Sequence, residues 1–234
     1  MSQPARWTGH LDNVLPARGS IQKVAHHPAV AYAVLPDFMA ALRERKSVSA
    51  RALEFLILCA ARTGAVIGAT RDEIDFEQKI WSVPPARAES KISGDEPRRI
   101  PLCDRAIEIL KALPHEQGNP YLFIGGLAGC GLSNMAMSEL MKDMAFASTT
   151  PGRLAVPHGF RSTFKDWVSE TTSYPSFVSE AALWHAVADK VEAAYRRGDL
   201  FNKRRKLMAD WAKYCAAPKR SGDGDVVVPI RRRK

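Results

Sequence analysis

The feature that most constrains the fold is a helix-length stretch, residues 49–62, in which apolar side chains occupy most faces. Its sequence is SARALEFLILCAAR. A helix that is apolar nearly all round has no face to offer to water, so we expect it in the middle of a core. Further stretches have helical apolar spacing and can surround it, at 36–45, 104–113, 161–170, 176–184, 190–197 and 200–214. We expect Asp104 to cap the second of these, and Ser133 to cap a methionine-rich helix through Phe146.

A different pattern begins after residue 75. Residues 79–83, KIWSV, alternate polar and apolar side chains, as a half-buried strand does, and residues 98–102, RRIPL, offer a partner strand. Between them, Ser93-Gly94-Asp95 has the composition of a turn. The sequence therefore predicts a mainly α protein with a small antiparallel β-sheet or hairpin, an α+β fold.

The ends of the chain differ from its middle. Residues 1–34 contain several prolines and glycines with only short apolar groups between them, which is typical of an interdomain linker or arm. Residues 35–216 form the predicted folded domain. Residues 217–234 are rich in Gly, Asp and Arg and end in RRRK, so we expect a basic, disordered tail.

The charge of the chain favours a polyanionic partner. Its 34 Lys and Arg against 25 Asp and Glu give a formal net charge of +9, and each phosphate contact made by such a surface releases counterions. Charge alone does not separate DNA, RNA and an anionic membrane. No apolar run approaches the roughly 20 residues that span a bilayer. The four cysteines are scattered, without a C-x-x-C pair, which favours reduced thiols in the cytosol and argues against a zinc site.

Five residues are candidates for chemistry, and each also has an ordinary structural interpretation. Arg62 follows the apolar helix, where it would cap the carboxyl end or meet an anion. His158 and Arg161 form an H-x-x-R pair on one helix face, either unrelated or converging on one small anion. In the ordinary interpretation, His185 is a histidine packed in the fold, and Tyr195, beside two arginines, packs on one face of an amphipathic helix. Their order along the chain distinguishes these alternatives.

That order, with a lysine on the hairpin between the two arginines, resembles the tyrosine recombinases. Locally, the sequence resembles the P4-like branch of the prophage integrases in RALEFLILCAARTG, EIDFEQKIWSVP, RRIPL, HGFRSTFKDW and KVEAAYRRGD. The resemblance runs from about residue 35 to about residue 215, and the opening ARWTGHLDNVLP resembles the interdomain linker of that branch. It implies the tyrosine recombinase catalytic-domain fold and DNA strand breakage and rejoining without a metal or cofactor.

Residue by residue, the resemblance implies a catalytic set composed of Arg62, Lys91, His158, Arg161, His185 and Tyr195. The two arginines would hold the non-bridging oxygens of the scissile phosphate and stabilise the charge of the transition state. The lysine would protonate the departing 5′ oxygen. The first histidine would assist proton transfer and the second would bind the phosphate. The tyrosine would attack phosphorus and form a 3′-phosphotyrosyl link.

The sequence departs from the family pattern at three places. Ala65 stands where the family usually has Glu, Ala188 stands where it often has Gly, and the hairpin at 91–98 is longer than usual. Full-length relatives also carry an arm-binding and a core-binding domain ahead of this one. These departures leave open a catalytically weakened or inactive DNA-binding remnant. A type IB topoisomerase-like relaxing activity is a second alternative.

The resemblance also implies the partners. We expect double-stranded DNA as substrate, a monomer in isolation and a homo-tetramer on two DNA duplexes, with no membrane association. Helices at the carboxyl end of the family usually pack onto a neighbouring protomer, and residues 200–214 are the candidate for that exchange. The expected location is the bacterial cytoplasm, at the nucleoid. The target DNA site is not readable from the sequence.

Overall fold

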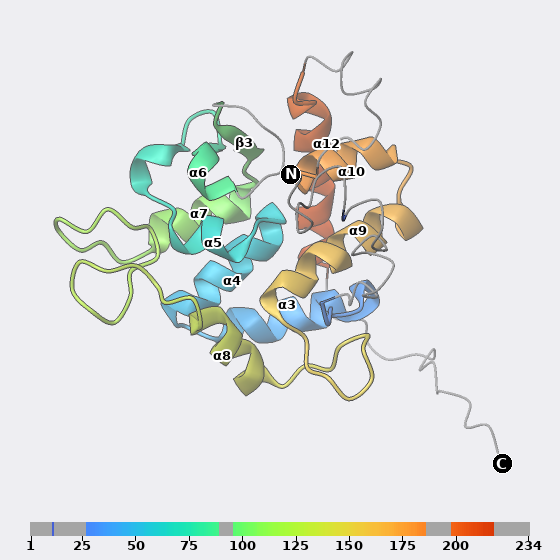
Figure 1. The fold of residues 1–234 in the computed structure, drawn as a ribbon, viewed down its shortest axis with the longest axis horizontal. Coiled ribbons are helices and arrows are strands. Elements are labelled where there is room, and N and C mark those ends of the chain that lie inside the picture. The colour runs from blue at the N-terminus through green and yellow to red at the C-terminus, as the bar shows by residue number, and fades with distance from the viewer. Residues whose placement is uncertain (1–10, 12–26, 89–95, 186–197, 218–234) are drawn as a thin grey trace, which may run out of the picture.

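A computed structural model describes residues 11, 27–88, 96–185 and 198–217. Helix α4 (Val48–Cys59) runs through the middle of the molecule, with other helices around it (Figure 1). Every residue of α4 from Ala52 to Cys59 is buried. The prediction of a central core helix from its uninterrupted apolar composition is therefore confirmed.

Most of the surrounding helices follow the predicted stretches closely, but the short helix at 63–67 was not predicted. The surrounding helices are α3 (Leu35–Glu44), α5 (Thr63–Ile67), α7 (Asp104–Ala112), α8 (Ala136–Met144), α9 (Phe160–Thr171), α10 (Ser176–Ala182) and α12 (Phe201–Cys215). Short 3-10 helices are η2 (Tyr32–Val34), η3 (Arg71–Glu73) and η4 (Pro157–Gly159). The predicted helix at 190–197 lies outside the described residues.

Helix α4 ends earlier than its apolar sequence predicts. Its last residue is Cys59, and Ala60 follows in the left-handed conformation at φ 48°. The amide of Ala61 then donates to the carbonyl of Leu56, 3.1 Å away, which closes the end of the helix. No glycine marks this turn, so the end of the helix at Cys59 could not be predicted from the sequence. As a result, Arg62 does not lie on α4 but precedes α5.

Two predicted caps are wrong. Asp104 is the first residue of α7, and Cys103 occupies the N-cap position without a side-chain cap. Helix α8 begins at Ala136 with Met135 as its N-cap, so Ser133 lies outside the helix. Both differences are shifts of one or two residues at a helix start, where local sequence specifies the boundary least.

The predicted hairpin is present as part of a three-stranded antiparallel sheet. Its strands are β1 (Ile74–Asp75), β2 (Ile80–Val83) and β3 (Arg98–Pro101), in that spatial order. Trp81 of β2 lies opposite Ile100 of β3, and both are buried. A short helix, α6 (Pro85–Ala88), follows β2, and the predicted turn at 93–95 lies outside the described residues.

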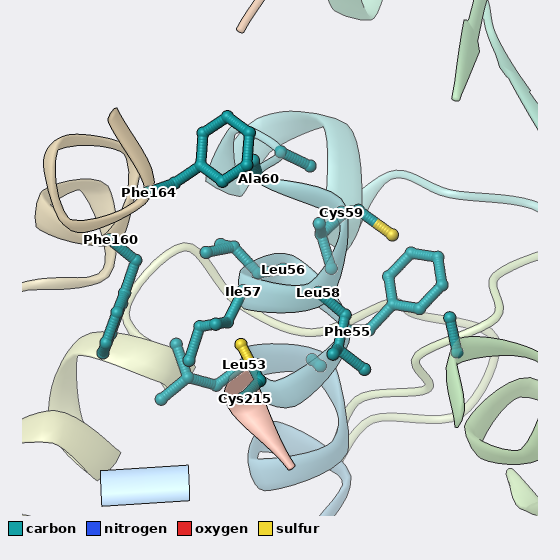
Figure 2. Packing of buried hydrophobic residues seen from close by; sticks show 14 of the residues in the cluster. Leu53, Phe55, Leu56, Ile57, Leu58, Cys59, Ala60, Phe160, Phe164 and Cys215 are labelled. Atoms are coloured by element: carbon teal, nitrogen blue, oxygen red, sulfur yellow. The ribbon is translucent and has the colours of Figure 1, made fainter. Parts of the chain in front are cut away.

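Helix α12 packs onto the core of its own chain. Trp211 is fully buried and donates its indole N–H to the carbonyl of Ile57 in α4, 2.8 Å away. Cys215, at the end of α12, is buried beside the side chains of α4 (Figure 2). In the single chain, the apolar side of the helix completes the core in place. The packing of residues 200–214 onto a neighbouring protomer stays a prediction.

A buried carboxylate joins three of the helices. Glu54 of α4 is fully buried and bonded to Arg43 of α3 at 2.9 Å, Arg51 of α4 at 2.7 Å and Arg105 of α7 at 2.9 Å. Burial raises the pKa of Glu54, but the hydrogen bonds and charges of Arg105 and Arg43 outweigh it and leave the pKa lowered.

The predicted domain boundaries at 34 and 217 stay predictions. Ala29 and Val30, inside the predicted linker, are buried against the folded domain. Nearly all of the predicted basic tail lies outside the described residues. In the described part of the chain, no helix is both long and apolar enough to cross a membrane.

Candidate active site

Arg161, in the first turn of α9, is the most deeply buried of the predicted site residues that the structure describes. It is 5% exposed, and its Nη1 donates to the carbonyl of Ala60, 2.9 Å away. Its Nη2 donates to the carbonyl of Leu183, 2.5 Å away. These carbonyls lie at the carboxyl ends of α4 and α10, where the helix dipole stabilises a cation. The guanidinium group therefore ties three helix ends together at one place.

Arg62 approaches the same place from the other side. It precedes α5 in an extended conformation, and its Cζ atom lies 5.7 Å from the ring centroid of Trp184, an indole that supports the guanidinium by a cation–π contact. Trp184 is itself 5% exposed and has a φ of 56° in the turn that follows α10. Burial lowers the pKa of Arg161 and that of His158 most, and the positive charge of Arg62 lowers both further, so both groups lie within its field.

His185 lies in direct contact with Arg161. Its Nε2 is 3.2 Å from Nη2 of Arg161, and its Nδ1 is 2.6 Å from Oε2 of Glu180. A guanidinium group can only donate, so Nε2 accepts in this arrangement. The proton of a neutral ring then sits on Nδ1, which donates to the carboxylate of Glu180.

Glu180 is itself held by Lys165 of α9, whose Nζ lies 2.7 Å from Oε1 of the carboxylate. Lys165 also donates to the hydroxyl groups of Ser176 at 2.9 Å and Ser179 at 2.8 Å. Burial raises the pKa of Glu180, but the hydrogen bonds of Lys165 and His185 outweigh it and leave the pKa lowered. Glu180 is thus an ionised group that fixes the orientation of the His185 ring.

Sequence reasoning missed this Lys165–Glu180 pair. A signal for the lysine existed, because residues 161 and 165 are four apart and share one helix face. Glu180 gave no such signal. It meets His185 only because the chain turns after α10, where the amide of His185 donates to the carbonyl of Glu180, 3.0 Å away.

His158 lies in η4, three residues before Arg161. Burial lowers its pKa first, and the positive fields of His27, Arg161 and Arg62 lower it further, to about 4. The pKa of Arg161 is lowered to about 10, by burial and then by Arg62, against the opposing effect of Glu180. At neutral pH, His158 is therefore an uncharged base next to two guanidinium groups.

Ala65 is buried in α5, at the position where the sequence departs from the family. Its carbonyl accepts a hydrogen bond from Nη1 of Arg87, 3.2 Å away, and Arg87 is ion-paired with Glu73. A guanidinium–carboxylate pair of other residues thus lies next to the backbone of Ala65.

Four of the six predicted catalytic residues are described, and they come together from three segments that lie far apart in the sequence: Arg62, His158, Arg161 and His185. Lys91 and Tyr195 lie outside the described residues. Within the described ranges, no group of three or more His, Cys, Asp or Glu is arranged to hold a metal ion. Two guanidinium groups and two imidazoles in one place have the chemistry of an anion-binding site.

The chain is similar in sequence to known integrases. No protein-family model matches the chain. The chain is 31% identical over 188 residues to prophage integrase IntA of Escherichia coli (strain K12), covering 79% of this chain and 43% of that protein. It is 27% identical over 208 residues to the integrase of Enterobacteria phage P4, covering 83% and 47%.

The chain belongs to the tyrosine recombinase family of phage integrases. It spans less than half the length of these two integrases. Its fold is similar to the integrase from mycobacterium phage Brujita, with a TM-score of 0.56 at 16% identity, covering 87% of this chain and 63% of that one. It is also similar to XerA recombinase, with a TM-score of 0.53 at 13% identity, covering 80% and 66%. The predicted fold class, a tyrosine recombinase catalytic domain, is confirmed.

Proposed function

We propose that the chain is the catalytic domain of a site-specific DNA recombinase that cuts and rejoins double-stranded DNA through Tyr195. The single observation that carries this proposal is the concentration of positive charge around Arg161. Burial and mutual repulsion lower the pKa of Arg161 to about 10 and that of His158 to about 4. An anion between these groups relieves that repulsion, and a phosphodiester supplies two non-bridging oxygens for the two guanidinium forks.

The nucleophile of the proposed reaction is the phenol of Tyr195. His158, uncharged at neutral pH, accepts the phenolic proton as the oxygen attacks phosphorus. The bond between phosphorus and the 5′ oxygen breaks, and Lys91 donates a proton to that oxygen. A 3′-phosphotyrosyl ester remains, and its energy is available for attack by the 5′ hydroxyl of a second strand, which releases the tyrosine.

Arg62, Arg161 and His185 stabilise the phosphoryl group during both steps. In the free protein, Nη2 of Arg161 donates to Nε2 of His185 and to the carbonyl of Leu183. A phosphate oxygen takes the place of the contact with His185, and Nε2 then donates to the phosphate when it carries a proton. Glu180 keeps the ring in the required orientation through Nδ1.

A solved relative supports DNA as the substrate. The Tn1549 transposon integrase, in complex with transposon right end DNA, has a similar fold. The TM-score is 0.54 at 17% identity, covering 88% of this chain and 71% of that one. The net charge of +9 supports the same substrate. We further propose a monomer that assembles as a tetramer on two DNA duplexes, acting at the nucleoid of a bacterial cell to integrate or excise a mobile element.

A nicked suicide substrate tests the proposed chemistry. Such DNA loses a short fragment after cleavage, so the covalent protein–DNA adduct accumulates and is seen as a shifted band in a denaturing gel. We expect the adduct with the wild-type chain supplied with the upstream half of prophage integrase IntA, and none with Tyr195→Phe.

Two further variants localise the chemistry. Arg161→Lys is expected to lower adduct formation at least a hundredfold, because an ammonium group lacks the fork that bonds two oxygens at once. Arg153→Lys, at an exposed arginine of the turn before η4, is the matched control and is expected to change it little. DNA binding without any adduct contradicts the proposal and leaves a DNA-binding remnant. Relaxation of supercoiled plasmid without site preference contradicts the site-specific assignment.

A further inference from the structure

The end of the predicted linker is fastened against the H-x-x-R segment by its backbone. The carbonyl of Pro28 accepts from the amide of Val156 at 3.0 Å, and the carbonyl of Ala29 accepts from the amide of Thr149 at 2.8 Å. The carbonyl of Val30 accepts from the hydroxyl of Thr163 at 2.6 Å. Three consecutive carbonyls are thus bound, which gives residues 28–30 a fixed place beside the start of α9.

Gly159 permits this close approach. A Cβ atom at this position would overlap the carbonyl oxygen of Pro28 and crowd the Cα atom of Ala29. Glycine is therefore required by the neighbouring backbone, and the linker end lies directly against the residue that follows His158. Pro28 is buried in this contact, so the residue before it is held at the edge of the site.

That residue is His27, and its ring lies against the ring of His158. The ring centroids are 4.3 Å apart, with an angle of 54° between the ring planes. His27 is exposed, so its imidazole reaches both the solvent and the proposed general base. Two imidazoles at this distance repel each other when both carry a proton, and one of them is already close to two arginines.

We propose that His27 is a positioning residue of the active site, whose imidazole packs against His158 and holds it uncharged for proton transfer. The proposal rests on the proposed function only for what His158 does; the contact itself is a property of the free protein. The charged or titratable groups that face His158 are His27 from the linker, Arg161 on α9, Arg62 before α5 and His185 after α10. When His27 carries a proton, its positive charge acts on His158 together with the other groups. Protonation of the neutral His158 ring then becomes less favourable.

The direction of the effect follows from this field. His158 takes up a proton as the pH falls through its pKa of about 4. His27→Phe keeps an aromatic ring of similar size against His158 but never carries a charge. Removing the positive field of His27 raises the pKa of His158. As the pH falls, His158 then becomes protonated, and stops acting as a base, at a higher pH than in the wild-type chain. Thr163→Val releases the carbonyl of Val30 and loosens the linker end, so it moves the pKa in the same direction.

A nuclear magnetic resonance titration of the free chain tests this inference directly. The chain has 6 histidines, and the His158 ring signal is assigned with a His158→Gln sample. We expect the midpoint of His158 in His27→Phe to rise by about half a pH unit or more. His115→Phe, which replaces an exposed histidine in the loop after α7, is the matched control and leaves the midpoint unchanged. An unchanged midpoint in His27→Phe overturns the inference.

The cleavage assay separates this inference from the proposed function. With the suicide substrate, the acid limb of the pH–rate profile moves to higher pH in His27→Phe than in the wild-type chain. A raised His158 midpoint with no adduct from any variant supports the contact and overturns the proposed function. A normal adduct rate with identical pH profiles overturns the role of His27 alone.

Discussion

His185 and Glu180 are joined through a contact of 2.6 Å between Nδ1 and Oε2, while the opposite ring nitrogen faces Arg161. One carboxylate thus fixes both the tautomer and the direction of an imidazole that lies in the anion-binding site. The carboxylate is in turn fixed by Lys165, 2.7 Å away. The orientation of a phosphate-binding group therefore depends on two side chains that do not bind the phosphate.

Replacing Glu180 with glutamine tests that dependence. The amide is of the same size but carries no charge, so the His185 ring loses its fixed tautomer and direction. We expect adduct formation on the suicide substrate to fall by roughly tenfold to a hundredfold, with DNA affinity changed by less than about threefold. Glu170→Gln, at an exposed position near the end of α9, is the control. Equal adduct rates for both variants and the wild type would remove Glu180 from the site.

Glu54 is expected to be a stability residue. It is fully buried and bonded to three arginines. Glu54→Gln leaves the guanidinium groups without their counter-charge, and we expect a loss of about 3 kcal/mol in the free energy of unfolding at pH 7, measured by urea denaturation. Glu108→Gln removes an exposed carboxylate that also bonds Arg105, and it is expected to cost less than about 1 kcal/mol.

The pH dependence of this effect has a definite sign. The folded pKa of Glu54 is lowered from 4.5, so its carboxylate stabilises the fold above pH 4.5. The contribution is lost as the pH falls through the folded pKa, which lies below that value. The difference in unfolding free energy between wild type and Glu54→Gln is therefore expected to decrease as the pH is lowered below 4.5. A difference that grows on acidification contradicts the lowered pKa.

Arg204 is expected to hold the segment that follows Tyr195. It is 4% exposed and donates to the backbone carbonyls of Asp199 at 2.7 Å and Arg99 at 2.6 Å, and to the Asp199 carboxylate at 2.9 Å. Asp199 also accepts from Arg99 of β3 at 2.9 Å. These bonds tie the chain four residues after Tyr195 to the strand that follows the Lys91 hairpin.

Arg204→Met breaks this tie while keeping most of the side-chain volume. We expect the free energy of unfolding to fall by about 2–3 kcal/mol, because buried acceptors lose a charged donor. We also expect adduct formation to fall more than DNA affinity does. Arg205→Met, one residue further along α12 and exposed, changes stability by about 0.5 kcal/mol or less. The prediction is wrong if the two variants unfold at the same urea concentration.

Ala145 offers a stabilising substitution. It is an exposed residue at the end of α8 with a φ of 51°, a conformation that costs an L-residue roughly 1 kcal/mol and glycine nothing. Ala145→Gly is expected to raise the free energy of unfolding by about 0.5–1 kcal/mol. Ala112→Gly, at the exposed last residue of α7, is expected to lower it by a similar amount. Thermal unfolding of the two variants distinguishes these opposite signs.

Most of the fold was predictable because its helices and the β2–β3 pair follow local periodicity. The apolar spacing of residues 104–113 and the alternation of residues 79–83 reflect which side chains are buried in α7 and β2. The end of α4 was not predictable, because Ala60 adopts a left-handed conformation without the glycine that usually marks it. Its carbonyl is held there by Arg161, from a helix 101 residues further along the chain.

The central helix, the family resemblance and the residue types of the site could be predicted from the amino-acid sequence, because burial patterns and the order of motifs are properties of the linear chain. The groups that surround each site residue could be identified only in the three-dimensional fold. Glu180 contacts His185 because the chain turns after α10. His27 contacts His158 because residues 28–30 are bound beside the start of α9. Such contacts depend on the path of the backbone between distant segments, and no local pattern of side chains encodes that path.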